Sequence, residues 1–170
     1  MKTLNKPEFI LVLLYLCFFG YLAFYVSYLP DCVATHFDGG GHPNGWMNRS
    51  SYMLFMVIFS FVLPLFLIGI SYTCRFFPDK YFNIPHRDYW LAPQRRAETF
   101  SYLVTHSLWF ACIALSFIIG IHFSIVKANS LTPAHLSTPL ILGLLGCFLA
   151  GLVIWIVSMI LHFNSASKSA

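Results

Sequence analysis

The stretch Phe9–Tyr28, FILVLLYLCFFGYLAFYVSY, decides how this chain folds. It contains no Asp, Glu, Lys or Arg, and its length matches the roughly 20 apolar residues that a helix needs to cross about 30 Å of hydrocarbon. Three further runs, 52–73, 101–126 and 140–163, are also free of these charged residues. The sequence therefore predicts four membrane-spanning helices, at about 9–28, 52–73, 101–126 and 140–163.

The composition favours the same fold class. Of 170 residues, 9% are charged and 58% are hydrophobic, whereas a soluble domain has about 25% charged residues. Backbone polar groups in lipid must be bonded within the protein, and the Gly, Ser and Pro pattern does not fit short barrel strands. We expect an all-α membrane protein in which residues 1–170 form one four-helix domain in contact with the lipid bilayer. The net charge of +4 does not indicate nucleic-acid binding, because most basic residues lie near the ends of the apolar runs.

Basic residues near the helix ends predict the orientation, since cytoplasmic segments carry an excess of Lys and Arg. On one side of the four predicted helices lie Lys2, Lys6, Arg75, Lys80, Arg87, Arg95, Arg96 and Lys168, and on the other lie Arg49 and Lys127. This asymmetry predicts that both termini are cytoplasmic. It makes residues 30–51 an outer loop and residues 74–99 an inner loop.

The outer loop, 30–51, is rich in residues that form turns. Its motif residues are Thr35, His36, Phe37, Asp38, Gly41, Pro43, Gly45 and Trp46. Glycine allows backbone angles that other residues avoid, and Pro-Asn-Gly is a common turn sequence. Thr35, Phe37 and Trp46 supply side chains that can pack, so we expect a structured loop that holds its shape or meets a partner.

The same loop contains a possible set of metal ligands. His36, Asp38 and His42 form His-x-Asp-x-x-x-His, and neutral imidazole with carboxylate is a common ligand set for transition metals. Two His and one Asp would leave a coordination position open for water, as in a catalytic zinc site. The alternative is that His36 bonds to the loop backbone and His42 is exposed to solvent.

The inner loop, 74–99, carries a second group of polar and aromatic residues. The residues expected to contact lipid or a partner are Asn83, Pro85, Tyr89, Trp90, Pro93, Arg95, Arg96 and Glu98. Tyr89 and Trp90 suit a membrane interface, and the Arg side chains suit anionic lipid head groups. An interfacial anchor and a docking surface for a protein partner both fit this pattern.

Both loops resemble a known family. The outer segment carries Leu29-Pro30, Thr35-His36-Phe37 and Gly41-x-Pro43-x-Gly45-Trp46, and the inner segment carries Asn83-Ile84-Pro85, Tyr89-Trp90-Leu91-Ala92-Pro93, Arg95-Arg96 and Glu98-Thr99. These motifs are similar to the bacterial membrane family called domain of unknown function 1648, which also occurs in the amino-terminal half of SdpI-type immunity proteins. The resemblance implies a bacterial cytoplasmic-membrane protein. SdpI-type members confer resistance to a secreted peptide toxin and can sequester a repressor, but they carry additional membrane helices.

Three functions are considered. The favoured hypothesis is a non-enzymatic membrane protein without a cofactor that contacts another membrane protein or a second copy, either in a complex or as an SdpI-like immunity or sensor factor. The first alternative is a metal-dependent membrane enzyme that uses His36, Asp38 and His42. The second alternative is a small transporter or oligomeric channel. It is less favoured, because the apolar runs contain few polar residues that could line a path across the membrane. We expect His106 to form an interhelical hydrogen bond, and His122 and His162 to lie near opposite interfaces.

Overall fold

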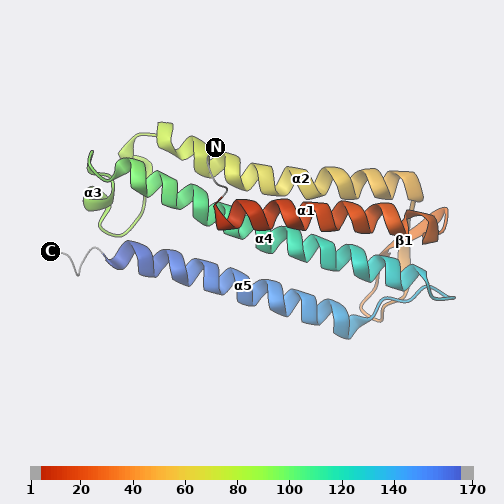
Figure 1. Cartoon of the computed structure of the whole chain (residues 1–170). Coiled ribbons are helices and arrows are strands. Elements are labelled where there is room, and N and C mark those ends of the chain that lie inside the picture. The colour runs from red at the N-terminus through yellow and green to blue at the C-terminus, as the bar shows by residue number, and fades with distance from the viewer. Residues whose placement is uncertain (1–4, 166–170) are drawn as a thin grey trace.

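The computed structural model describes residues 5–165, which form a bundle of four long helices (Figure 1). The long helices are α1 (Lys6–Tyr25), α2 (Arg49–Thr73), α4 (Arg96–Asn129) and α5 (Thr138–Asn164). All four are long and apolar enough to cross a membrane. The prediction of four spanning helices is therefore confirmed, and they indicate a multi-pass membrane protein.

The short elements lie at the two ends of the bundle. Between α1 and α2 come η1 (Val26–Tyr28) and the strands β1 (Cys32–Phe37) and β2 (Pro43–Asn48), and between α2 and α4 come η2 (Cys74–Phe76), η3 (Asp79–Tyr81) and α3 (Arg87–Trp90). The β1–β2 hairpin lies at one end of the bundle and α3 lies at the other (Figure 1).

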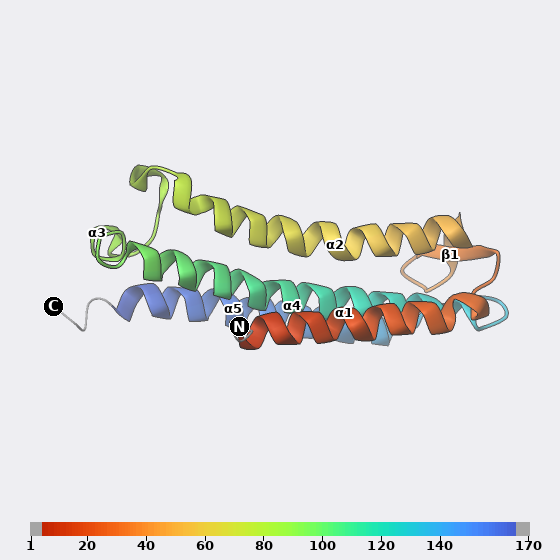
Figure 2. The same ribbon diagram turned by 45° about the horizontal axis from the view of Figure 1, so that its top comes forward.

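Helix α4 is the centre of the bundle, because α1, α2 and α5 each pack against it. It also has the most buried side chains of the four helices, whereas Phe163 is the one described residue of α5 that is buried. Toward the α3 end, α2 diverges from α4 (Figure 2). The first residues of α1 and the last of α5 point toward this same end (Figure 1).

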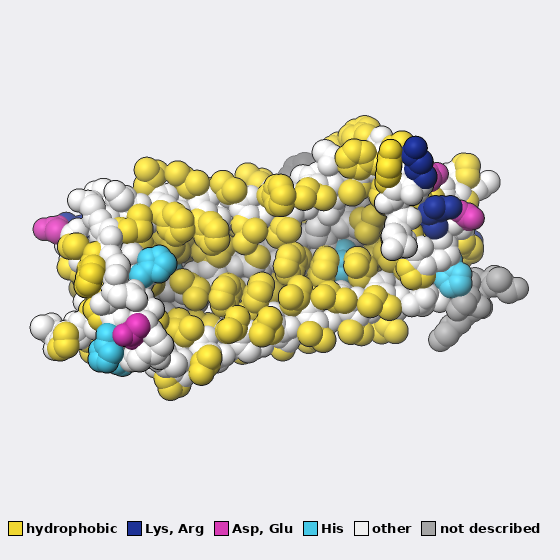
Figure 3. All heavy atoms as spheres, turned by 180° about the vertical axis from the view of Figure 1, so that it is seen from behind, with side chains coloured by type: hydrophobic (Ala, Val, Ile, Leu, Met, Phe, Trp, Pro, Cys, Tyr) yellow, Lys and Arg dark blue, Asp and Glu magenta, His cyan; other side chains and the backbone are white. Residues whose placement is uncertain are grey.

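Apolar side chains cover the middle of the molecule, and the charged side chains gather at its two ends (Figure 3). Leu16, Leu54 and Ile154 are 67%, 60% and 69% exposed. Such exposure would destabilise a protein in water, but it suits contact with lipid tails. The distribution of surface residues therefore agrees with a protein embedded in a bilayer.

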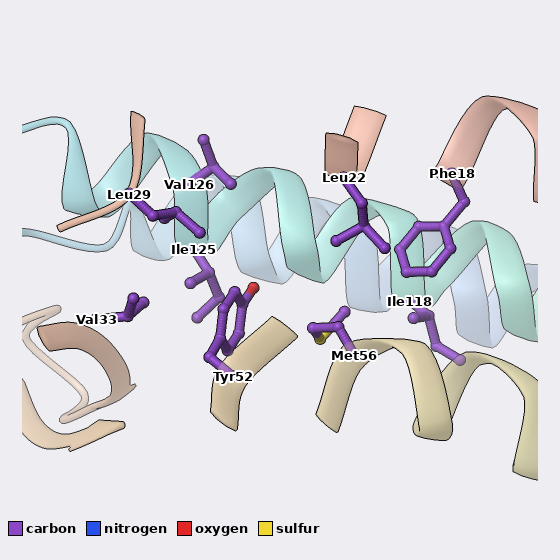
Figure 4. Close-up of a cluster of buried hydrophobic side chains, with 9 residues drawn as sticks. All are labelled: Phe18, Leu22, Leu29, Val33, Tyr52, Met56, Ile118, Ile125 and Val126. Atoms are coloured by element: carbon purple, nitrogen blue, oxygen red, sulfur yellow. The ribbon is translucent and has the colours of Figure 1, made fainter. Parts of the chain in front are cut away.

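A cluster of buried apolar side chains joins α1, α2, α4 and the start of the hairpin (Figure 4). Its members are Phe18, Leu22 and Leu29 from α1 and the segment after it, Val33 from β1, Tyr52 and Met56 from α2, and Ile118, Ile125 and Val126 from α4. Because lipid tails are as apolar as these side chains, van der Waals complementarity stabilises such a cluster more than exclusion of water does. The packed cluster places the hairpin directly on α2 and α4.

Two details of the predicted fold are corrected. The class all-α is incomplete, because the segment predicted as outer loop 30–51 contains a two-stranded antiparallel sheet. Each helix begins before its predicted start, although α1 ends at Tyr25 rather than at 28. The largest difference is in α4, which runs from Arg96 to Asn129 rather than over 101–126. The predicted bounds of this helix end where the apolar run meets charged residues. In the structure, Arg96, Glu98 and Lys127 belong to the same helix and continue it at both ends.

Candidate functional site

The hairpin is an antiparallel pair whose register is irregular near its tip. The paired residues are Cys32 with Asn48, Val33 with Met47, Ala34 with Trp46, His36 with Gly45, and Phe37 with Pro43, with shifts on either side of His36. A side chain at Gly45 would lie 2.9 Å from the Cβ of His36. Glycine is therefore needed at this position so that β2 can pass close to the His36 side chain.

Asp38 shapes the turn that joins the two strands. One oxygen of its carboxylate accepts the backbone N–H groups of His42 and Gly40, each at 2.9 Å. The backbone N–H of Asp38 in turn donates to the carbonyl of His42 at 2.9 Å. The N–H groups of His42 and Gly40 lower the pKa of the Asp38 carboxyl, because they stabilise its charged form.

The tip of the hairpin docks on the segment between α4 and α5. Gly41 has a φ of 83°, which favours glycine, and its carbonyl accepts the backbone N–H of Leu136 at 2.9 Å. A Cβ at Gly41 would lie 2.3 Å from the carbonyl oxygen of Leu136. The rings of His42 and His135 face each other edge to face, with 5.3 Å between their centroids. The tip is thus fitted against a segment nearly a hundred residues away along the chain.

Asn129, near the end of α4, holds β1 from its outer side. Its side-chain oxygen accepts the N–H of Ala34 at 2.8 Å, and its side-chain nitrogen donates to the carbonyl of Ala34 at 2.9 Å. The same nitrogen donates to the carbonyl of Ile125, also at 2.9 Å. Asn129 therefore acts like a short piece of a neighbouring strand, and sequence reasoning missed it because no local pattern signals such a role.

Arg49 joins the two ends of the hairpin. Its guanidinium donates to the carbonyl of Leu29 at 2.9 Å and to the carboxylate of Asp31 at 2.6 Å. Its backbone N–H donates to the carbonyl of Asp31 at 2.9 Å. The first residue of α2 thereby fixes the chain that leaves α1. The position of Arg49, a basic residue shortly after the turn residues of the hairpin, is the sequence feature from which this role could have been predicted.

The anchored hairpin presents a large aromatic side chain. Trp46 is 56% exposed, whereas Val33 and Ala34 on the paired strand are buried. Phe37 is half-buried and packs against the core cluster. The hydroxyl of Thr35 is buried and has no hydrogen-bond partner among the described residues. Of the motif residues, His36, Asp38 and Trp46 are exposed, and the Asp38 carboxylate is already bonded to the turn.

The predicted ligand set is not brought together. Within residues 5–165, no group of three or more His, Cys, Asp or Glu side chains is placed to hold a metal ion. His36 lies in β1 against Gly45, while the carboxylate of Asp38 is used by backbone N–H groups of the turn. The neighbour of His42 is His135 rather than His36. The spacing of His36, Asp38 and His42 in the sequence does not show that the pairing of β1 with β2 separates their side chains.

A buried polar pair lies beneath the hairpin. The hydroxyl of Tyr52 in α2 is 2.6 Å from Nδ1 of His122 in α4. His122 is fully buried, and its Nε2 has no partner among the described residues. We expected His122 near a membrane interface, but Tyr52 provides the hydrogen bond that lets the imidazole lie inside the bundle.

At the opposite end, two arginines of the predicted inner loop fold back on the loop itself. The guanidinium of Arg95 lies 3.8 Å from the centre of the Tyr89 ring and donates to its hydroxyl. Arg96 pairs with Asp79 and donates to the carbonyl of Phe77 at 3.3 Å. Both side chains therefore stabilise the path of the chain between α2 and α4.

Trp90 ties the same loop to the last turn of α5. Its indole N–H donates to the carbonyl of Phe163 at 2.8 Å, and its own carbonyl accepts the hydroxyl of Thr99 at 2.8 Å. Asn83 and Pro85 lie between η3 and α3, Pro93 precedes α4, and Glu98 lies in the first turn of α4. The inner-loop residues thus form an ordered end of the bundle but do not converge on one site.

The expected interhelical bond of His106 is present. Its Nε2 is 3.1 Å from the carbonyl of Trp155 in α5, and the indole N–H of Trp155 donates to the carbonyl of His106 at 2.9 Å. Nearby, Tyr102 stacks on His162, with 3.5 Å between ring centroids. These rings join α4 to α5 as packing contacts, so the side chains of Tyr102 and His106 are used within the bundle.

Residues 13–62 match the model of the family described as Domain of unknown function (DUF1648). The matched segment contains most of α1, the whole hairpin and the first half of α2, and it confirms the resemblance of the outer segment. The inner-segment motifs at 83–99 lie outside the match. No curated protein and no solved structure matches the chain. The hairpin and the two helices that carry it are therefore the part of this chain that the family model describes.

Proposed function

We propose that this chain is a non-enzymatic membrane protein that acts through protein contacts made by its hairpin. It serves as a subunit of a membrane complex or as an immunity or sensor factor of the SdpI type. The partner is another membrane protein or a second copy of the chain. The proposed location is the bacterial cytoplasmic membrane, with both termini cytoplasmic and the hairpin outside.

One observation carries this proposal: a hairpin held rigidly at three places presents Trp46 to its surroundings. Asn129 fixes its side, Arg49 fixes its base and Leu136 fixes its tip. A preformed surface loses little conformational entropy on binding, which favours affinity for a partner. Tryptophan is also among the residues that contribute most to protein interfaces.

The proposed orientation is supported by charge. The two described helix ends that flank the chain termini lie toward the α3 end, and the basic residues of the segment between α2 and α4 lie there as well (Figure 1). Such an excess of Lys and Arg is typical of the cytoplasmic side. The hairpin is at the other end, where it would meet partners outside the cytoplasm.

The proposal is tested by purification from native membranes in a mild detergent, with Trp46→Ala compared to Trp109→Ala. Trp109 lies in α4 and is 39% exposed, so it is a matched control on the side of the helix bundle. We expect wild type and Trp109→Ala to retain a stoichiometric partner or a second copy, and Trp46→Ala to lose it. Retention of the same species by Trp46→Ala would show that the hairpin is not the contact surface.

A further inference from the structure

A second site lies at the opposite end of the bundle, where α2 diverges from α4 (Figure 2). Here a cavity of about 700 Å³ opens between the start of α1, the end of α2 and the first turns of α4. Its volume is in the range of roughly 300–1,000 Å³ that is typical of small-ligand sites. It is separate from the hairpin, and none of the contacts described for the hairpin involves it.

The cavity exists because α1 is shorter than α4. The thiol of Cys112 contacts the carbonyl of Pro7 at 3.5 Å, so α1 begins beside the middle of α4. From Arg96 to Leu108, a length of about 18 Å at 1.5 Å per residue, the described part of α1 does not continue alongside α4. With α2 bending away on the other side, this part of α4 is left open.

Three residues that line this space have hydrogen-bond donors without partners among the described residues. The guanidinium of Arg75 lies over the ring of Tyr72 and uses its Nε–H for the Tyr72 carbonyl at 2.9 Å, but its two terminal NH₂ groups bond to no described residue. Its side chain also has no carboxylate within ion-pair distance among residues 5–165. The hydroxyls of Ser101 and Thr105, one turn apart on α4, likewise bond to nothing in the described chain. A cation and two hydroxyls facing one cavity are suited to phosphate oxygens.

Most of the remaining lining is apolar, and the second cation that lines the cavity, Arg96, already pairs with Asp79. Phe76, Phe100, Val104 and Leu108 contribute to the same cavity, and the last two lie toward the middle of the bundle. One acid, Glu8, also lines it, and the Glu8 carboxylate is already bonded to the backbone N–H of Asn5 at 2.9 Å. The cavity thus combines polar donors at the end of the bundle with an apolar wall that leads toward the hydrocarbon.

We propose that this cavity binds an anionic phospholipid. The phosphate lies against Arg75, Ser101 and Thr105, and an acyl chain leaves along Val104 and Leu108 into the bilayer. A soluble phosphate would use only the polar half of the site, whereas a lipid uses both halves. The bound lipid would fill the space that α1 leaves open and connect α2 to α4 at this end.

The test is native mass spectrometry of the purified full chain, titrated with phosphatidylglycerol or with phosphatidylcholine. We expect the wild type to bind phosphatidylglycerol at least about tenfold more tightly, because the positive choline group of phosphatidylcholine repels Arg75 and cancels the net negative charge of the lipid. Arg75→Gln should reduce phosphatidylglycerol affinity by about tenfold. The Ser101→Ala, Thr105→Val double variant, which keeps the cation, should reduce it severalfold. Arg87→Gln, outside the cavity at the same end, should stay within about twofold of wild type.

Equal losses in Arg75→Gln and Arg87→Gln would show attraction by general surface charge and would overturn the proposal. The proposal would also be overturned if the Ser101→Ala, Thr105→Val variant and Arg75→Gln both kept the phosphatidylglycerol affinity of the wild type. Displacement of the lipid by inorganic phosphate at equal concentration would mean that the apolar wall contributes nothing, which also contradicts a lipid site. Resistance to inorganic phosphate at a large excess would support it.

Discussion

Asn129 shows how a single residue can hold a hairpin on a helix bundle. Its side chain makes hydrogen bonds to both backbone groups of Ala34, a residue that is 2% exposed. In Asn129→Ala these buried groups lose their partners, which costs roughly 1–3 kcal/mol for each group left unsatisfied. We expect the variant to be less stable by about 2–3 kcal/mol, and the Ala34 amide to exchange its hydrogen at least about tenfold faster.

Hydrogen exchange of purified protein in detergent measures this effect. Asn44→Ala, an exposed asparagine in β2, is the matched control and should change stability by less than about 0.5 kcal/mol. If the Ala34 amide exchanged at the same rate in Asn129→Ala as in wild type, the anchoring role of Asn129 would be wrong.

Gly41 provides a sharper test of the docked tip. An alanine there would adopt an unfavourable φ of 83° and place its Cβ 2.3 Å from the carbonyl oxygen of Leu136. We expect Gly41→Ala to lower the free energy of unfolding by about 2 kcal/mol or more. Gly39→Ala is the control, because nothing lies within 4 Å of its added Cβ, and it should change stability by less than about 0.5 kcal/mol. Thermal unfolding of the two variants should therefore differ clearly, and equal melting temperatures would argue against a docked tip.

The pH dependence of the turn follows from Asp38. Backbone N–H groups of His42 and Gly40 hold the pKa of its carboxyl below its ordinary value of about 3.9. Because the folded pKa is the lower one, the stabilising effect of Asp38 is fully present above the unfolded pKa and is lost as the pH falls through the folded pKa. We expect the side-chain carboxyl carbon shift of Asp38 to titrate with a midpoint below about 3.9. In Asp38→Ala this titration should be absent. A midpoint at or above the ordinary aspartate value would contradict the hydrogen-bonded turn.

At the scale of elements, α2 and α4 are joined by one buried polar contact within an apolar interface. Tyr52→Phe would remove the hydroxyl that lies 2.6 Å from Nδ1 of His122 and would leave both nitrogens of a fully buried imidazole without partners. We expect a loss of about 1–3 kcal/mol, measured by unfolding in mixed micelles. Tyr28→Phe, at a tyrosine that is 66% exposed, should have almost no effect. Similar stabilities for the two variants would mean that the pair does not hold the helices together.

The elements also show what the sequence can reveal and what it cannot. Four apolar runs predict four helices because the bilayer thickness sets their length. The turn residues of 30–51 lie in the segment that forms the hairpin. The strands were not predicted, since β2 contains Pro43 and Gly45, which are unfavourable in strands. Their pairing is completed by Asn129, which is 95 positions from Ala34. Contacts over such a separation leave no local pattern in one sequence.

For the whole molecule, the bundle separates two ends with different chemistry. One end carries the anchored hairpin within the segment that the DUF1648 model matches, and the other carries α3, most of the arginines and the cavity of about 700 Å³. The three helices around α4 leave broad apolar faces that suit lipid (Figure 3). In the function proposed above, the hairpin is the surface for a partner and the apolar helix faces are the surface for the bilayer.

The most direct test of this account places a photo-activatable cross-linking amino acid at position 46 in native membranes, with position 16 in α1 as the control. Trp46 and Leu16 are both well exposed, at 56% and 67%, but only the first lies on the hairpin. We predict a discrete protein adduct, with a partner or a second copy, at position 46, and adducts with lipid alone at position 16. Adducts with lipid alone at both positions would contradict a hairpin that acts through protein contacts.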